Sequence, residues 1–295
     1  MIPTYQPNES HLRVSIESVL DQDFDSSWPE IEVVDDCSPD IDVEAIVKRF
    51  GRGRVAFSRN SENLGLAGCW NRCIERARGE WIHILHQDDY VLPGFYQRIR
   101  KAIASHPDVC LAATRSFFVD SEAQIMAVTG RLRRLENGGR QADDFFYDTP
   151  IQCPGVVVRR DFYNKNGGFA SDLKYVLDRE MWARAIAEGG GIIVPDVLAC
   201  YRRSERNETS RIMRTADGLK EINTLNHLFS ARFPRFDLDA ANLKLRNLAI
   251  WEARQREARG DTDSAQAYRN FWKCHTPLSL RLRSVAGSLL RTIIG

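Results

Sequence analysis

The sequence predicts an α/β fold with a mixed, mainly parallel sheet, flanking helices and a helical extension at the carboxyl end. Up to about residue 105, short apolar segments alternate with helical patterns, as they do in parallel βαβ units. From about residue 216 the pattern is helical throughout. With 295 residues, 43% of them hydrophobic, the chain is long enough to bury a large core.

Apolar runs predict strands at residues 31–36, 55–60 and 81–86. Apolar residues at three- and four-residue spacing predict helices at residues 10–22, 40–51 and 63–79. The last two helices end on Gly51 and Gly79. Because the carboxyl ends of parallel strands form the ligand-binding edge of such a sheet, the residues at these ends are candidates for binding. They are Asp35, Asp36, Asn60 and residues 86–89.

The remainder of the chain is less regular. A strand is predicted within residues 151–160, a helix at 178–190 and a mobile, glycine- and arginine-rich loop at 130–141. Residues 242–261 and 262–275 predict a helical hairpin that turns at Gly260 and Asp261. We expect three regions, at residues 1–105, 106–215 and 216–295.

The carboxyl-terminal tail, residues 277–295, has an apolar face and a basic face, and residues 264–295 contain no acid. Two interpretations remain open: a helix docked on its own domain, or an amphipathic helix that lies on a membrane surface. No apolar run reaches the ~20 residues that span a bilayer, and no amino-terminal signal pattern is present. We expect a cytoplasmic protein, with peripheral contact at the inner face of the membrane through this tail.

Composition excludes several classes of function. Lys and Arg (41) balance Asp and Glu (40), so no global charge predicts a nucleic acid partner. The seven cysteines lack CxxC pairs, which argues against a zinc site or a disulfide framework. Cys69 and Cys73 lie one helical turn apart, and we expect them to face the core rather than a metal.

An acidic pair follows the apolar run of the segment WIHILHQDDY, residues 81–90. Adjacent carboxylates repel each other, so a fold accepts them where water solvates them, where one is neutralised or where a cation binds. His83 is expected to be buried and hydrogen-bonded, because strand alternation directs it away from the face of His86. Asp143 and Asp144 form a second pair, but no strand precedes them, and a solvated loop is expected there.

Five blocks occur in an order that resembles family 2 glycosyltransferases. They are IPTY, VVDDCSPD, RNSENLGLAGCWN, RGEWIHILHQDDYVLPGFY and GGFASDLKYVLDREMWARA, within residues 2–210. The resemblance implies a GT-A fold and an inverting enzyme that uses a nucleotide sugar, expected to be a UDP-sugar. It implies a donor-binding half at residues 1–105 and an acceptor-side half at 106–215. The family's first strand is usually longer than the one that Met1 precedes here, and we expect a misplaced start or a frayed edge.

The resemblance places Pro3, Thr4, Tyr5, Asp35 and Asp36 at the nucleoside. An Asx-type turn that caps the next helix is the alternative interpretation of the VVDDCSPD block, and both can hold at once.

Asn63, Gly65 and Asn71 match the family's N-x-G-x-x-x-x-x-N spacing beside the nucleotide, at a helix amino terminus. Trp70 stands where many members carry an arginine, and Arg59 is a candidate to replace that arginine at the phosphates.

The acidic block resembles the family's L-D-x-D-D metal motif, with His86 at the first acidic position. The resemblance implies that Asp88, with Asp89 as a second ligand, binds Mg²⁺ or Mn²⁺ and that the ion contacts the diphosphate of the donor. His86 is open to three interpretations: a contact with the nucleotide sugar, a metal ligand or a cap on the strand.

Asp178 matches the aspartate that serves the family as general base, and the alternative is a plain helix N-cap. Leu177 stands where a glutamate often precedes the base. In YRRSERNETS, residues 201–210, Arg202 and Arg203 are candidates for the diphosphate, while Ser204 stands where a histidine is usual.

We therefore expect a metal-dependent inverting glycosyltransferase that acts on a glycan or a lipid-linked saccharide, without a nucleic acid partner. The alternative is a catalytically inactive scaffold that binds nucleotide or glycan, suggested by His86, Trp70, Ser204 and the short first strand.

Overall fold

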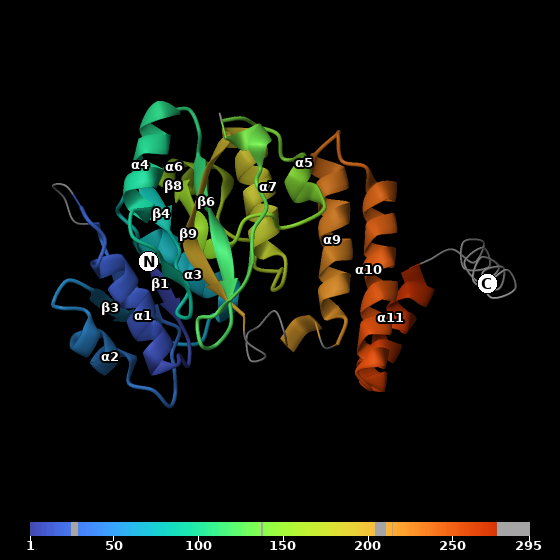
Figure 1. Cartoon of the computed structure of the whole chain (residues 1–295), viewed down its shortest axis with the longest axis horizontal. Coiled ribbons are helices and arrows are strands. Elements are labelled where there is room, and N and C mark those ends of the chain that lie inside the picture. Colours follow the sequence, from blue (N-terminus) through green and yellow to red (C-terminus); the bar gives the residue numbers. More distant parts are fainter. Residues whose placement is uncertain (25–28, 137, 204–210, 214, 276–295) are drawn as a thin grey trace, which may run out of the picture. The chain divides into compact units, whose positions relative to one another are not determined.

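The computed structural model describes residues 1–24, 29–136, 138–203, 211–213 and 215–275. The chain divides into two compact units, Met1–Ser204 and Glu205–Gly295. Every strand in the described ranges belongs to the first unit, and the long carboxyl-terminal helices belong to the second (Figure 1). The expected division of the first unit near residue 105 stays a prediction.

The first sheet contains three parallel strands in the order β1-β2-β3. The strands are β1 (Ile2–Thr4), β2 (Glu32–Asp35) and β3 (Ala56–Arg59). The helices that follow them are α1 (Glu9–Leu20), α2 (Val43–Phe50) and α3 (Gly65–Arg76). The expected alternation of strands and helices is confirmed, with α3 ending three residues before Gly79. β1 is fully buried and paired along its length with β2, so its edge is not frayed.

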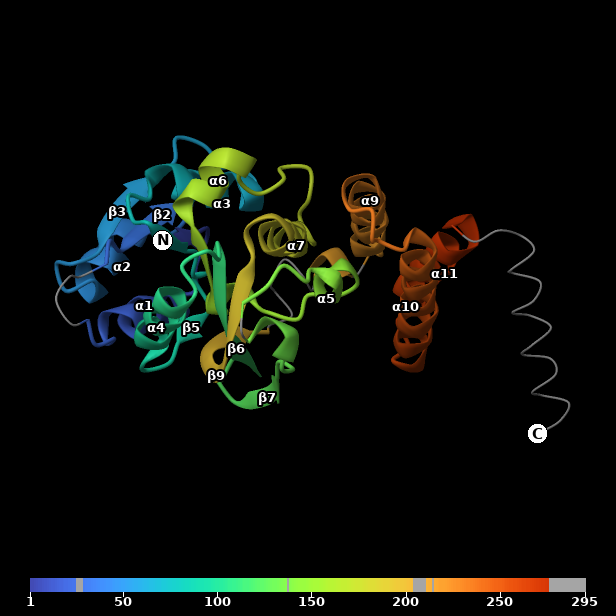
Figure 2. The ribbon, with the colours of Figure 1, turned by 90° about the horizontal axis from the view of Figure 1, so that it is seen from above.

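The second sheet is mixed and has the order β4-β8-β6-β9-β5, with β7 paired to β6. β6 and β9 run parallel, and the other pairs of this sheet are antiparallel. Its strands are β4 (Trp81–His83), β5 (Tyr90–Val91), β6 (Leu111–Val119), β7 (Ile125–Val128), β8 (Val156–Arg159) and β9 (Gly191–Arg202). Figure 2 shows α1 and α4 (Phe95–Ser105) on one face of the sheets and α3 and α6 (Arg160–Asn166) on the other.

The two sheets meet at Met1. The Met1 nitrogen donates to the His83 carbonyl at 2.9 Å, and the Leu85 nitrogen donates to the Met1 carbonyl at 3.0 Å. This is the pattern of a parallel pair, so the chain after β4 runs beside β1 in the same direction. Residues 86–89 therefore reach the edge at which β1, β2 and β3 end.

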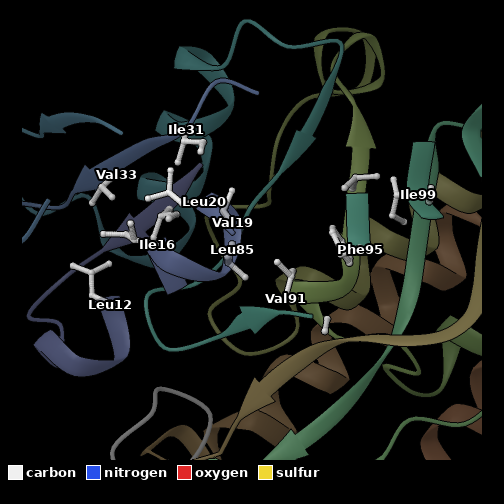
Figure 3. Packing of buried hydrophobic residues seen from close by; sticks show 14 of the residues in the cluster. Leu12, Ile16, Val19, Leu20, Ile31, Val33, Leu85, Val91, Phe95 and Ile99 are labelled. Atoms are coloured by element: carbon white, nitrogen blue, oxygen red, sulfur yellow. The ribbon is translucent and has the colours of Figure 1, made fainter. Parts of the chain in front are cut away.

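A core cluster packs α1 against the first sheet (Figure 3). Leu12, Ile16 and Val19 recur at helical spacing on α1, and each is at most 4% exposed. They share the cluster with Val33 of β2 and with Phe95 at the start of α4. Burial of each such side chain contributes about 1.5–3 kcal/mol, so this cluster stabilises the packing of α1 on the first sheet.

Short helices fill the middle of the chain. They are η1 (Arg133–Leu135), α5 (Asp143–Phe146) and η2 (Cys153–Gly155), and α7 (Leu177–Gly189) follows. The expectation of a loop at Asp143 and Asp144 is wrong, because both begin α5. The buried rings of Phe145 and Phe146 hold that turn against the core. Cys69 and Cys73 are buried on α3 beside Val34, as expected.

The second unit contains α9 (Asp217–Arg232), α10 (Leu238–Ala258) and α11 (Thr262–His275). The expected hairpin is confirmed: Gly260 has φ +79°, and Asp261 accepts a hydrogen bond from the Ser264 nitrogen at 3.2 Å. Within the described residues, no helix has the length and hydrophobicity needed to span a membrane. The tail at 277–295 lies outside the described residues.

His83 is buried as expected. Its Nδ1 lies 2.9 Å from the Tyr96 hydroxyl and its Nε2 lies 3.0 Å from the Pro154 carbonyl oxygen. Both ring nitrogens are therefore used within the protein. Burial lowers the pKa of His83 to about 3.

This pKa predicts a loss of stability in acid. The unfolded chain binds a proton at His83 below about pH 6.5, whereas the folded chain resists protonation until near pH 3, so the loss grows between these values. Between pH 7.5 and pH 5, His83 should remove about 2 kcal/mol from the free energy of unfolding. Urea unfolding at both pH values should show a smaller loss for His83→Gln than for the wild type. The exposed His227→Gln is the control, and an equal loss in all three proteins would contradict this assignment.

Candidate functional site

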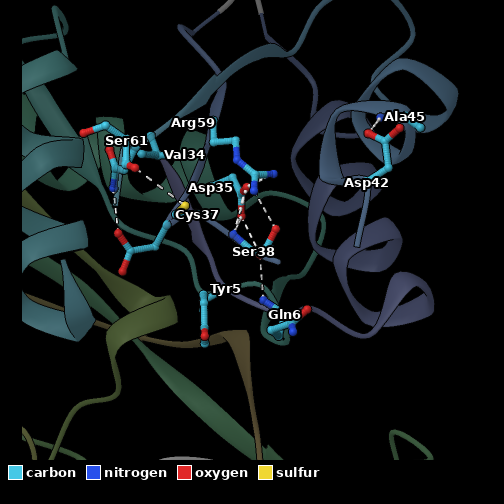
Figure 4. Close-up of polar contacts among 12 residues, drawn as sticks. Tyr5, Gln6, Val34, Asp35, Cys37, Ser38, Asp42, Ala45, Arg59 and Ser61 are labelled. Atoms are coloured by element: carbon cyan, nitrogen blue, oxygen red, sulfur yellow. Dashed lines mark hydrogen bonds and ion pairs between the residues drawn. The ribbon is translucent and has the colours of Figure 1, made fainter. Parts of the chain in front are cut away.

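Three loops at the carboxyl edge of the first sheet are bonded to one another. The Tyr5 nitrogen donates to Gln87 Oε1 at 2.8 Å, and Gln87 Nε2 donates to the Tyr5 carbonyl at 3.1 Å. The Gln6 nitrogen donates to Ser38 Oγ at 2.8 Å (Figure 4). The segment Pro3–Tyr5 is thereby fixed beside residues 86–89. The Tyr5 side chain remains 46% exposed, which leaves its ring accessible to a ligand.

Asp35 is buried and bonded within the protein. It accepts hydrogen bonds from Ser38 Oγ at 2.5 Å and from the Ser38 nitrogen at 3.2 Å. Arg59 Nη1 lies 3.1 Å from Asp35 Oδ2, and Arg59 Nη2 donates to the Ser38 carbonyl (Figure 4). These contacts form a turn within this block, as the alternative interpretation expected. They also hold Arg59 at Asp35. The expected cap on the next helix is wrong, because α2 is capped by Asp42, whose Oδ1 accepts from the Ala45 nitrogen at 2.9 Å.

Asp36 organises the start of α3. Its carboxylate accepts hydrogen bonds from Asn60 Nδ2 at 2.7 Å and from the backbone nitrogens of Leu64 and Gly65 at 3.0 Å each. Asn63 Oδ1 also accepts from the Gly65 nitrogen at 3.0 Å. Gly65 has φ +72°, a conformation that glycine adopts at no steric cost. The structure therefore brings Asp36, Asn63 and Gly65 together, and their contacts with a nucleotide stay predictions.

Asn71 connects α3 to a segment 98 residues away. Its Nδ2 donates to the Phe169 carbonyl at 2.9 Å, and its Oδ1 accepts from the Phe169 nitrogen at 2.7 Å. A Cβ on Gly168 would lie 2.1 Å from Asn71 Oδ1, so this position requires glycine. Asn71 therefore positions the loop that precedes α7, a role that its sequence spacing did not indicate.

Four aromatic rings continue this connection across the site. His86 stacks on Trp70 with ring centroids 4.7 Å apart and planes 27° apart. Trp70 meets Phe169 edge to face at 4.8 Å, and Phe169 meets Trp182 of α7 at 5.8 Å. The rings join the acidic loop to α3 and to α7. The two departures from the family pattern, Trp70 and His86, are thus one contact.

Arg202 is bonded to the acidic loop, residues 86–89. The Arg202 nitrogen donates to Asp89 Oδ1 at 2.8 Å, and Arg202 Nε donates to the Asp88 carbonyl at 2.9 Å. Its Nη1 donates to the carbonyls of Asp120 and Ser121, each at 2.9 Å. Arg202 is buried, so in this arrangement it positions the loop. A diphosphate contact from Arg202 stays a prediction.

Arg203 stacks on Phe118 with its guanidinium carbon 4.1 Å from the ring centroid. Ser204 lies outside the described residues.

His86, Asp88 and Asp89 have the arrangement of a metal site. One ligand atom from each lies within 4.8 Å of the others. His86 Nδ1 lies 3.3 Å from Asp89 Oδ2, and neither this oxygen nor His86 Nε2 has a hydrogen-bond partner that meets the usual geometry. Buried polar atoms normally have partners. Carboxylate and imidazole groups also suit a divalent cation, so these residues fit the expected metal.

The charges of this group are strongly coupled. Burial, and after it the charge of Asp89, raises the pKa of Asp88 to about 6, while His86 acts in the opposite direction. Burial lowers the pKa of His86, but interactions with Cys153 and Asp89 outweigh it and raise this pKa well above its usual value. A cation beside Asp88 would favour its ionised form.

Asp178 is the second residue of α7, and the residue at the N-cap is Val176. The N-cap interpretation of Asp178 is therefore wrong, although its Oδ1 accepts from the Arg179 nitrogen at 2.7 Å. Burial raises the pKa of Asp178, and the charge of His86 lowers it. Since His86 acts on Asp88 in the same way, it lies within electrostatic reach of both carboxylates. His86 thus interacts electrostatically with both Asp88 and Asp178.

Trp182 contributes to the site through its ring contact with Phe169, and the sequence analysis did not identify it as a site residue. Gln87 lies within residues 86–89, which were predicted as binding candidates, but its bonds to Tyr5 were not predicted.

Sequence comparison identifies relatives of the chain. The sequence model described as Glycosyl transferase family 2 matches residues 1–167. An uncharacterized protein of Mycobacterium tuberculosis is 31% identical over 72% of this chain and 69% of its own length. The succinoglycan biosynthesis protein ExoO of Rhizobium meliloti is 28% identical over 84% of this chain and 71% of its own length.

Solved structures share the fold. TarS of S. aureus, crystallised with UDP-GlcNAc, is 17% identical with a TM-score of 0.61, over 84% of this chain and 70% of that one. The mannosyltransferase PcManGT of Pyrobaculum calidifontis, solved with GDP-Man and Mn²⁺, is 18% identical with a TM-score of 0.62, over 98% of this chain and 78% of that one. The expected GT-A fold is confirmed. Because the family model covers more than half of the chain, this protein belongs to glycosyl transferase family 2 and is a glycosyltransferase.

Proposed function

We propose that the enzyme transfers a sugar, with inversion, from a UDP-sugar to a hydroxyl group of a glycan or lipid-linked saccharide. The observation that carries the proposal is that ring contacts from His86 through Trp70 and Phe169 to Trp182 join the loop of Asp88 to helix α7, which carries Asp178. Both carboxylates have pKa values raised by burial. The nucleotide sugars in the titles of the TarS and PcManGT structures support the donor class. The family relationship supports glycosyl transfer.

The donor side comprises residues 1–105. The exposed Tyr5 is available to the nucleoside, and the α3 amino terminus lies at the same edge, with its first amides bonded to Asp36. Asp88, with Asp89, would hold the cation. When bound, Mg²⁺ or Mn²⁺ supplies positive charge where negative charge develops on the departing nucleoside diphosphate. PcManGT was solved with Mn²⁺, which supports the same ion class here.

The acceptor side comprises residues 106–215, with Asp178 as general base. Its carboxylate takes the proton from the acceptor hydroxyl, and the oxygen attacks the anomeric carbon on the face opposite the diphosphate. One such displacement inverts the anomeric centre. The raised pKa of the buried Asp178 makes it a stronger base than an exposed aspartate.

An inactive scaffold is the alternative, and Trp70 with His86 was its main motivation. The structure favours the enzyme, because the two residues stack on each other instead of leaving a gap or an unpaired charge. Arg202 and Asp89 also hold the acidic loop in place. An inactive site would not require His86 and Trp70 to stack on each other and support the acidic loop.

The biological setting follows from the relatives. ExoO is named for succinoglycan biosynthesis and AmsE for amylovoran biosynthesis, which supports a role in the synthesis of a cell-envelope polysaccharide. We place this activity in the cytoplasm, at the inner face of the membrane, with residues 277–295 as the membrane contact.

The base assignment predicts the effect of Asp178→Asn. Loss of a general base lowers kcat by about 10²–10⁴, while UDP binding measured by calorimetry should remain. Asp172→Asn, an exposed aspartate in the preceding segment, is the matched control and should keep its activity. Near-wild-type turnover by Asp178→Asn would remove the base from this mechanism.

The metal assignment predicts the effect of Asp88→Asn. Calorimetric titration of Mn²⁺ into the UDP complex should show affinity weakened at least about tenfold, because the variant loses a charged oxygen ligand. The control is Asp144→Asn, which alters another Asp-Asp pair, in the first turn of α5, and should keep the Mn²⁺ affinity of the wild type. Equal Mn²⁺ affinity in Asp88→Asn and the wild type would show that the cation binds elsewhere.

The stacked pair predicts energetic coupling between positions 70 and 86. His86→Asp alone places a carboxylate against the Trp70 ring and beside Asp88 and Asp89, so it should destabilise the fold. Trp70→Arg in the same chain should restore much of the loss, with a coupling energy of about 1 kcal/mol or more in urea unfolding. Trp251→Arg, at an exposed tryptophan, is the control and should be additive with His86→Asp. Additivity of the 70/86 pair would contradict the interpretation as one compensated change.

A further inference from the structure

Helix α7 carries two buried arginines with very different surroundings. Arg184 is 4% exposed, and the structure gives it five hydrogen bonds. Two go to the Glu180 carboxylate, and three go to the carbonyls of Asn166, Gly167 and Gly168. Arg184 therefore fixes residues 166–168, which directly precede the Phe169 that Asn71 binds. The carboxylate of Glu180 neutralises the charge of Arg184.

Arg179, just over one turn earlier, is 5% exposed and has no such partners. Its Nε and Nη2 are buried, and neither makes a hydrogen bond with a described residue. Asp178 and Asp148 are near enough to influence its charge, but neither forms an ion pair with it. One oxygen of Asp148 instead accepts from the Thr149 nitrogen at 2.8 Å.

A buried guanidinium without acceptors is unfavourable, since its hydration is lost and nothing replaces it. The start of α7 adds to the positive potential at Arg179, while the carboxylates of Asp178 and Asp148 reduce it. α7 is 13 residues long, and its N-cap, Val176, offers no capping side chain to the first-turn amides. Among these amides, the Arg179 nitrogen is bonded to Asp178. A buried, unpartnered cation at an uncapped helix start is a place where an anion binds.

We propose that Arg179 binds an anionic group, a carboxylate or a phosphate, on the acceptor saccharide. The proposal rests on the function proposed above, in which Asp178 works on the acceptor. The diphosphate of the donor belongs at Asp88, and in-line attack requires the base on the opposite side of the sugar. An anion next to the base is therefore part of the acceptor. The planar fork of arginine suits bidentate binding of either group.

Binding of small saccharides without donor tests this proposal separately from turnover. The probes are glucuronate, glucose 6-phosphate and neutral glucose, titrated into the full chain and followed by ligand-observed NMR. The wild type should bind at least one anionic sugar at least tenfold more tightly than glucose. Preference for glucuronate assigns a carboxylate, and preference for glucose 6-phosphate assigns a phosphate. Equal binding of all three sugars would overturn the proposal.

Two variants assign the effect to Arg179. Arg179→Met should abolish the preference for the anionic sugar and melt no lower than the wild type, because it removes an unpartnered buried charge. Arg100→Met, at an exposed arginine, should keep the preference. If Arg179→Met retains the preference, the proposal fails.

If Arg179→Met proves too unstable to test, the preference for the anionic sugar is measured in Arg179→Lys instead. This variant keeps the charge but loses the bidentate fork, so the preference should fall several-fold, and an unchanged preference would overturn the proposal.

Discussion

The contact between Phe169 and α3 is the constraint on which the site depends. Asn71 bonds both backbone polar groups of Phe169, and the Phe169 ring lies between Trp70 and Trp182. This single residue therefore joins the helix behind the acidic loop to the helix that carries the proposed base. Because the aromatic contacts continue from Trp70 to His86, a shift at Phe169 would alter the relation between donor side and acceptor side.

Buried charge is concentrated around this contact. Asp89 and Arg202 are buried, with the Asp89 carboxylate bonded to the Arg202 backbone, while Asp88 and Asp178 have pKa values raised by burial. Such an arrangement is costly in a folded protein unless a ligand supplies the missing partners. The unpartnered atoms of His86, Asp89 and Arg179 are of this kind. They define where a cation and, in our proposal, an acceptor anion would complete the network.

Other polar groups of the same edge are already satisfied within the protein. Asp35 is bonded to Ser38 and Arg59, and Asp36 is bonded to the start of α3. These residues shape the loops at this edge and leave Tyr5 exposed. Asp35 and Asp36 therefore build the site, whereas His86, Asp89 and Arg179 keep polar atoms without a hydrogen-bond partner in the protein.

The sequence by itself determined the elements with local signals. Apolar periodicity gave the first strands and helices and the hairpin at Gly260, and the acidic pair after a strand indicated the metal loop, because these signals depend on neighbours a few residues apart. It did not give the Trp70–His86 stack, the clamp from Asn71 to Phe169 or the lack of partners at Arg179. These depend on which distant segments meet, as residues 71 and 169 do, and pairing across such separations has no local periodicity. Only the tertiary structure decides it.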